Sequence, residues 1–130
     1  MKIPGPDGKY LRGKPLEKGD RGGLYSTFKV FQNDGVCVLQ FGPVVQWVGM
    51  LPEEAIGIAG TFRSEIRKAF GHLSYDPATF PLKVEADQEM NVVKTTLPIP
   101  TAALVANPEV FLVWADELDK AVKELWKTRN

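Results

Sequence analysis

Alternating apolar and polar positions mark the chain from residue 24 onward. Residues 24–31 predict a strand whose two faces differ, with Leu24, Ser26, Phe28 and Val30 on one face and Tyr25, Thr27, Lys29 and Phe31 on the other. The Asn-Asp-Gly run at 33–35 favours a tight hairpin turn, because glycine accepts a positive φ. Residues 36–42 predict the return strand. Gly42-Pro43 predicts its end, since proline lacks the N–H that a strand ladder needs. Residues 44–50 predict a third strand, so residues 24–50 would form an antiparallel meander.

The period then changes to that of an amphipathic helix over residues 52–70. Pro52 is typical of the first helical position, where the missing N–H is tolerated, and Glu53 and Glu54 complement the positive helix start. Arg67 lies in the expected last turn, and Gly71 is a natural stop.

The second half of the chain repeats strands and then a helix. Residues 81–99 predict a hairpin that turns near 87–89 and ends at the prolines at 98 and 100. Residues 101–106 indicate a helical turn. Asn107 and Pro108 are the expected N-cap and first residue of a last helix that runs to residue 127.

These elements predict an α+β fold with the order β-β-β-α-β-β-α. An antiparallel sheet, made of the three-stranded meander and the hairpin, would be packed by two amphipathic helices. We assign residues 24–130 to this single domain. Residues 1–23 differ from it, because they hold six of the twelve glycines, three of the ten prolines and six basic against three acidic residues. With almost nothing apolar to bury, they predict a flexible basic arm.

Composition narrows the functional classes. The 130 residues carry sixteen basic and sixteen acidic side chains, so the chain as a whole is not a polyanion binder by charge. A single cysteine excludes an intrachain disulfide, and no apolar run is long enough to cross a membrane. These features favour a cytoplasmic protein with no membrane partner.

No residue pattern predicts catalysis, so the expectation is a protein that is not an enzyme and needs no cofactor or metal. His72, the only histidine, falls in an expected loop without a partner that would make it a general base. Cys37 lies between two valines of a strand, where a buried thiol is the usual outcome. The glycine-rich run at 19–23 precedes a strand, which is the wrong context for a phosphate-binding loop.

The most specific feature is a pair of glycines inside the helix at 52–70. Each costs about 1 kcal/mol relative to alanine in a helix interior. On a helical wheel both lie away from the apolar stripe, so core packing does not require them. Three explanations are open: the glycines admit the backbone of another chain, they admit another segment of this chain, or they are tolerated drift. The corresponding interaction surface comprises Glu53, Ile56, Gly57, Gly60, Ser64 and Arg67.

The last helix poses a similar question, because its first turns are apolar nearly all round. Phe111, Trp114 and Leu118 belong to its core stripe, whereas Leu112 and Val113 lie off it. Either the segments before this helix cover its start, or a partner does.

We therefore expect a non-enzymatic protein–protein interaction module that self-associates, most simply as a homodimer. The alternative is a nucleic-acid-binding protein that uses the basic arm and an aromatic strand face, through charge and base stacking. Its contact residues would be Lys9, Arg12, Lys14, Lys18, Arg21, Tyr25 and Phe31.

Overall fold

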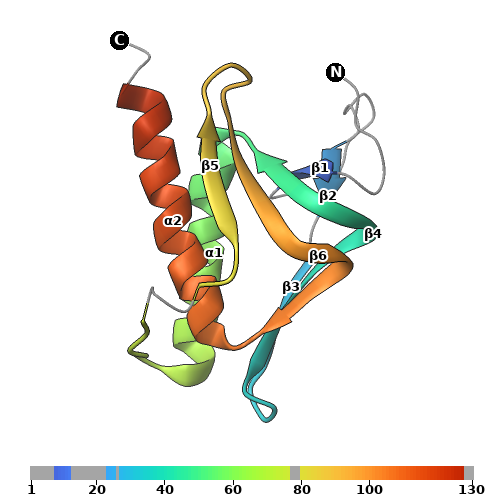
Figure 1. The fold of residues 1–130 in the computed structure, drawn as a ribbon. Helices are drawn as coiled ribbons and strands as arrows, with labels where there is room; N and C mark the ends of the chain where they lie inside the picture. Colours follow the sequence, from blue (N-terminus) through green and yellow to red (C-terminus); the bar gives the residue numbers. More distant parts are fainter. Residues whose placement is uncertain (1–7, 13–22, 26, 77–79, 128–130) are drawn as a thin grey trace.

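The computed structural model describes residues 8–12, 23–25, 27–76 and 80–127. The fold is α+β, with two helices lying side by side on one face of a sheet (Figure 1). The described residues form eight elements, in chain order: β1 (Gly8–Arg12), β2 (Gly23–Tyr25), β3 (Thr27–Phe31), β4 (Val36–Met50), α1 (Pro52–Phe70), β5 (Lys83–Asp87), β6 (Val92–Ala106) and α2 (Pro108–Lys127).

In the part of the chain that the structure describes, the sheet has six strands in the order β2-β1-β4-β6-β5, and β3 also pairs with β4. The pairs formed by β3, β4, β5 and β6 are antiparallel, as expected. The exception is β1, which runs parallel to both β2 and β4, so the sheet is mixed. The long strands β4 and β6 run alongside each other and connect the two halves of the sheet.

The predicted end of a strand at Gly42-Pro43 is wrong. Residues 36–50 form the one strand β4, because the register between β4 and β6 shifts between Gln40 and Val45 and Pro43 falls in that irregular stretch. A proline there removes no ladder hydrogen bond. Within the segment 24–31, Leu24 and Tyr25 pair with β1, and Thr27–Phe31 pairs with β4.

The prediction of a helical turn at 101–106 is also wrong, because these residues complete β6. The strand continues past Pro98 and Pro100, which lie at a second register shift, between the pairs Val45–Thr101 and Trp47–Thr96. The side-chain amide of Gln46 donates a hydrogen bond to the Leu97 carbonyl at 2.9 Å, which replaces part of the interrupted ladder. Beyond it, Leu104 pairs with Leu39, so the long-range partner decides the conformation.

Both helices begin at the predicted residues, and α1 also ends at the predicted residue. Pro52 opens α1, and Gly71 closes it with a φ of +74° while its N–H donates to the Arg67 carbonyl at 2.9 Å. Gly35 has a φ of +69° and ends the predicted hairpin turn between β3 and β4. Within the segment 81–99, Lys83–Asp87 pairs antiparallel with Val92–Thr96.

The core lies between the helices and the sheet. Phe62 of α1 contacts three other aromatic rings, with centroid distances of 4.8 Å to Phe28, 5.2 Å to Phe111 and 5.3 Å to Trp114. The indole N–H of Trp114 donates to the hydroxyl of buried Thr95 at 3.0 Å. This bond satisfies a polar pair that would otherwise be costly to bury.

The apolar start of α2 is buried within the chain. Phe111, Val113, Trp114 and Ala115 are all at most 3% exposed, and Leu112 packs against the core. No partner is needed to cover this helix start, which answers the question that the sequence left open.

The proposed arm at 1–23 is described only in part. Gly8–Arg12 forms β1, and Gly23 begins β2. The rest of the arm lies outside the described residues, so its flexibility remains a prediction. Within the part of the chain that the structure describes, no helix combines the length and the apolar character that a membrane span requires.

Candidate interaction surface

The six residues of the predicted interaction surface lie together on the outward side of α1. All six are exposed, whereas Ala55, Ile58, Ala59, Phe62 and Ile66 face the core. We call this outward side the α1 surface, and it comprises Glu53, Ile56, Gly57, Gly60, Ser64 and Arg67.

The space over the two glycines is open. A Cβ added at Gly57 or at Gly60 would meet no described atom within 4 Å. The glycines therefore do not admit α2, which was one of the segments considered for a contact within the chain. The Thr61 hydroxyl donates to the Gly57 carbonyl at 3.0 Å, so this side chain is held against the helix. The α1 surface is consequently shallow around its centre.

Apolar side chains stand at one end of the α1 surface. Ile56 is 41% exposed, and Leu51, which directly precedes the helix, is 44% exposed. Charge is divided between the ends, with Glu53 in the first turn and Arg67 and Lys68 in the last. Along the α1 surface, the side chains are therefore acidic and apolar at the start of the helix, small in its middle and basic at its end.

A second polar cluster, which the sequence did not reveal, joins the two helices. Arg63 of α1 contacts the carboxylates of Asp116 at 2.8 Å and Asp119 at 2.7 Å, both on α2. The Tyr75 hydroxyl donates to Asp116 at 2.6 Å. Asp116 and Asp119 lie three residues apart on the polar side of α2. Their spacing of three residues was the only signal in the sequence, because the position of Arg63 depends on the helix packing.

The interactions in this cluster favour an ionised Asp116 and a neutral Tyr75. Burial alone would raise the pKa of Asp116, but hydrogen bonds from Tyr75 and Arg63 outweigh it, and the pKa is lowered. The hydrogen bond to Asp116 raises the pKa of Tyr75, and burial adds to the effect. Neither group titrates near neutral pH. The cluster therefore fits a structural ion-pair network between the two helices better than a general acid and base.

The two residues considered for nucleophilic or base chemistry lie apart from any such arrangement. Burial, with a smaller contribution from the charge of Glu109, raises the pKa of Cys37 to about 11. Its thiol is therefore protonated at neutral pH and inaccessible. His72 is exposed just after α1, as predicted. Among the residues that the structure places, no three His, Cys, Asp or Glu side chains gather as metal ligands would.

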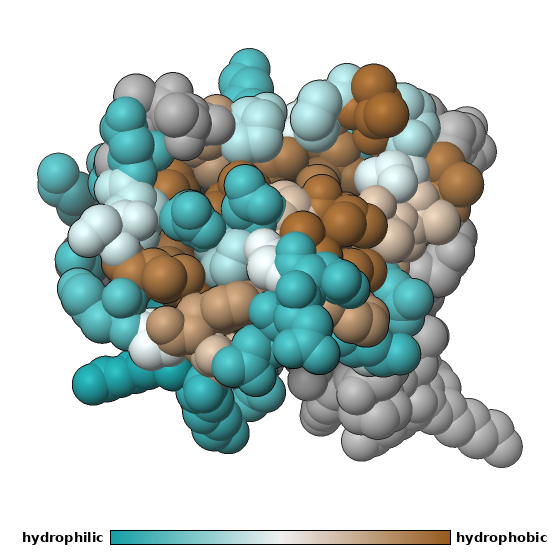
Figure 2. Space-filling model, turned by 90° about the horizontal axis from the view of Figure 1, so that it is seen from below, coloured by the Kyte–Doolittle hydropathy of each residue, from teal (hydrophilic) through white to brown (hydrophobic). Residues whose placement is uncertain are grey.

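The residues of the nucleic-acid alternative are only partly placed. Lys9 and Arg12 lie on β1 and Tyr25 on β2, while Lys14, Lys18 and Arg21 lie outside the described residues. Phe31 is 43% exposed at the end of β3. In the view from below the molecule, apolar surface occurs in several areas separated by hydrophilic side chains (Figure 2).

Comparison of the chain with protein families, with curated proteins and with solved structures found no match. The assignment of function therefore depends on the surface of the molecule itself.

Proposed function

We propose that this chain is a non-enzymatic protein–protein interaction module that self-associates as a homodimer through the α1 surface. The observation that carries the proposal is the heptad spacing of Glu53, Gly60 and Arg67, with open space over the middle residue. Residues seven apart differ by only about 20° around a helix, so these three lie in one line along its exposed side.

This line is complementary to itself in an antiparallel arrangement. Glu53 and Arg67 are each seven residues from Gly60. If two α1 helices cross at Gly60 on a two-fold axis, Glu53 of each chain lies level with Arg67 of the other. Gly57, Gly60 and Ser64 would then allow the two backbones to approach closely, as small residues do at helix crossings.

The energetic argument concerns the cost of the glycines. Two interior glycines cost about 2 kcal/mol of helix stability between them, and no described atom uses the space they leave. A second helix in that space would offset this cost, because the Ile56 side chain of each of the two chains would become buried.

The direct test is to fill the space at Gly60. In Gly60→Leu the new side chain would separate the two backbones, so the association through the α1 surface should be lost while circular dichroism retains the helical signal. Light-scattering mass measured across a concentration series gives the oligomeric state. A Gly60→Leu protein with the same dimer dissociation constant as the parent would refute the proposal.

Charge exchange is a second test with an internal control. Arg67→Glu should weaken the dimer, and the double variant Glu53→Arg/Arg67→Glu should restore it, because the pairs are reversed rather than removed. Lys68→Glu makes the same charge change at the neighbouring position, which lies off the line, and should leave the dimer nearly unaffected.

The second candidate, nucleic-acid binding, is supported by aromatic and basic side chains on β3 and the neighbouring strands. Lys29 is exposed two residues before the exposed ring of Phe31, and the ammonium of Lys94 lies 5.1 Å from the centroid of Trp47. Binding of this kind should weaken steeply with salt, because bound phosphates release counterions. Removal of residues 1–21 should then abolish it, and an oligonucleotide affinity that salt does not alter would dismiss this candidate.

A further inference from the structure

A different part of the molecule, strand β5, has a free edge that is separate from the α1 surface. Strand β5 is the end of the strand order, and among the described residues it pairs only with β6. Its other edge therefore presents backbone N–H and C=O groups without a strand partner. Such an edge can accept an added strand, and natural proteins usually cover it or protect it with charge.

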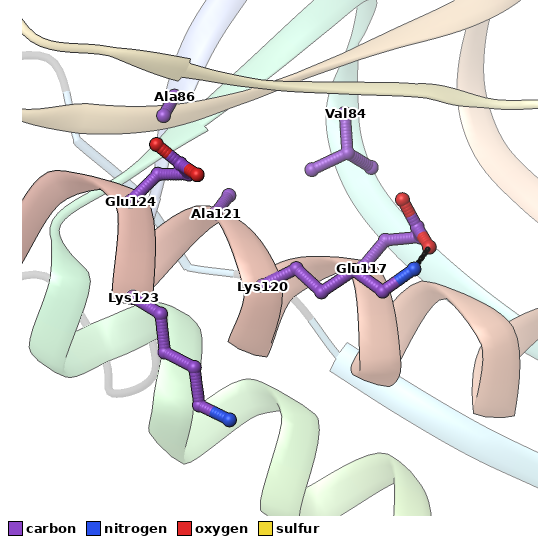
Figure 3. Close-up of a pocket in the computed structure, with 7 residues that line it drawn as sticks. All are labelled: Val84, Ala86, Glu117, Lys120, Ala121, Lys123 and Glu124. Atoms are coloured by element: carbon purple, nitrogen blue, oxygen red, sulfur yellow. Dashed lines mark hydrogen bonds and ion pairs between the residues drawn. The ribbon is translucent and has the colours of Figure 1, made fainter.

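A groove runs along β5 where the strand faces α2. It has a volume of about 430 Å³ and includes Val84, Ala86 and Ala121 among its lining residues. Val84 and Ala86 point from β5 toward the helix, and Ala121 lies between the carboxylates of Glu117 and Glu124 (Figure 3). The side chains of a strand added to β5 would alternate between this groove and the opposite face of the sheet.

The opposite face of β5 is charged. Val84 pairs with Thr95, which is bonded to Trp114 of α2, so Lys83 and Glu85 lie on the side away from the helices. Lys83 and Glu85 are exposed, and their charged atoms are 3.8 Å apart within the strand. This long contact between exposed groups is weak.

We propose that the free edge of β5 pairs antiparallel with β5 of a second copy of this chain, centred on Val84. In this register Val84 faces its own copy over the two grooves. Lys83 of each chain lies directly opposite Glu85 of the other. Since Glu85 also pairs with Lys94 of β6, each glutamate would stand between two lysines across the joined sheet. Opposite charges directly across a strand pair stabilise it, and like charges weaken it.

The alternative same-face registers are poorer. Centring the pair on Glu85 would place the two Glu85 carboxylates opposite each other. Centring it on Ala86 would place Glu85 opposite Asp87. The sequence of the strand, Lys-Val-Glu-Ala-Asp, thus favours one self-pairing over its neighbours.

The helices fit the same arrangement. Each α2 packs on both β5 and β6. The centres of two joined β5–β6 pairs would be about 10 Å apart, since neighbouring strands are spaced by about 4.8 Å. This equals the usual distance between packed helices, so the two α2 helices would meet across their grooves with Ala121 near the contact.

Charge exchange on β5 tests the pairing in the full chain. Glu85→Lys and Lys83→Glu should each weaken the association at least tenfold, because two attractive pairs become repulsive. Lys83→Glu/Glu85→Lys should restore it. Lys29→Glu, the same change on the exposed face of β3, is the matched control and should have no effect. Circular dichroism establishes that each variant is folded.

The two surfaces predict different assemblies. With both, light scattering should show species larger than a dimer as concentration rises; Gly60→Leu or Glu85→Lys alone should stop at the dimer, and the combination should be a monomer. If only the α1 surface associates, the parent stops at a dimer and Glu85→Lys leaves it intact. That result, or a double charge exchange that fails to restore the association, would overturn the β5 proposal while leaving the α1 proposal in place.

Hydrogen exchange provides an independent readout. The amides at 83–87 should become more protected as protein concentration rises, and Glu85→Lys should remove this dependence. Exchange at β5 that is the same at all concentrations would overturn the pairing.

Discussion

The two helices lie side by side on the same sheet, yet they stand in different relations to it. α2 has nine buried residues, and the apolar residues of its first turns are buried or partly buried. α1 is almost as long but has six buried residues, and its outward side carries two interior glycines under open space. Burial in the core explains nearly every apolar residue of α2. On α1, by contrast, the two glycines and Ile56 are exposed, so packing in the core does not explain them. This contrast is why the proposed contact is assigned to α1.

The largest effect should come from the enclosed part of α2. Trp114→Ala removes a fully buried ring and the partner of the Thr95 hydroxyl, which should cost about 3–5 kcal/mol of unfolding free energy. Urea denaturation followed by circular dichroism measures the loss. Trp126→Ala is the control on the same helix, because Trp126 is 45% exposed. Equal losses at the two positions would contradict the distinction between the buried and exposed sides of α2.

The next effect has the opposite sign and belongs to α1. At protein concentrations where the chain is a monomer, Gly57→Ala/Gly60→Ala should raise the unfolding free energy by about 1–2 kcal/mol. Alanine is the better helix former, and no described atom is close enough to clash. Ala59, buried on the same helix, offers the contrast, since Ala59→Gly should lower it. A loss of stability in the double alanine variant would mean that a segment of the chain occupies the space.

A smaller effect on the free energy of unfolding should come from the cluster of Arg63, Asp116 and Asp119 that joins the helices. This effect should change as the pH is lowered. The folded-state pKa of Asp116 is lowered, so its contribution is present above the unfolded-state value of about 4. It is lost as pH falls through the folded-state value. Asp116→Asn should therefore lower the stability at neutral pH by less than about 1 kcal/mol, because the ion pair is partly exposed. The variant should also lose less stability than the parent on acidification below about pH 5. Identical acid profiles for the two proteins would contradict this assignment.

The smallest effect should appear at alkaline pH. The pKa of Tyr75 is raised by its hydrogen bond to Asp116, so this contribution is present below the unfolded-state value of about 10 and is lost as pH rises through the folded-state value. Tyr75→Phe should reduce the alkaline loss of stability by a few tenths of a kcal/mol at most, as expected for exposed groups. The difference between the ultraviolet titration curves of the parent and the variant reports the ionisation of Tyr75, and a midpoint of this difference at or below about 10 would contradict a raised pKa at Tyr75.

Local signals in the sequence identified the helices well and the strands less well. Pro52 and Gly71 mark the ends of α1 correctly, because a missing N–H and a positive φ act on the helix backbone itself. Pro43, Pro98 and Pro100 were interpreted by the same local rule, and the rule failed there. Whether a proline ends a strand depends on the partner strand, and the shift in register between β4 and β6 is a property of both.

The candidate surfaces divide in the same way. The outward position of Gly57 and Gly60 follows from the helical period alone, and the structure places both on the exposed side of α1. Arg63, Asp116 and Asp119 could not be grouped beforehand, because their meeting depends on how two helices distant in sequence pack together. The free edge of β5 could not be predicted either, because the sequence of a single strand does not specify the order of the strands in the sheet.

The sequence by itself therefore determined the α+β class, both helices with their ends, and the face of α1 that is left over after the core is built. Only the tertiary structure decided that residues 36–50 and 92–106 are continuous strands, that β1 runs parallel to β4, and that α2 needs no partner at its start. The physical reason is range. Helix periodicity and capping act within a few residues, whereas strand pairing, register and helix-to-helix contacts depend on segments tens of residues apart.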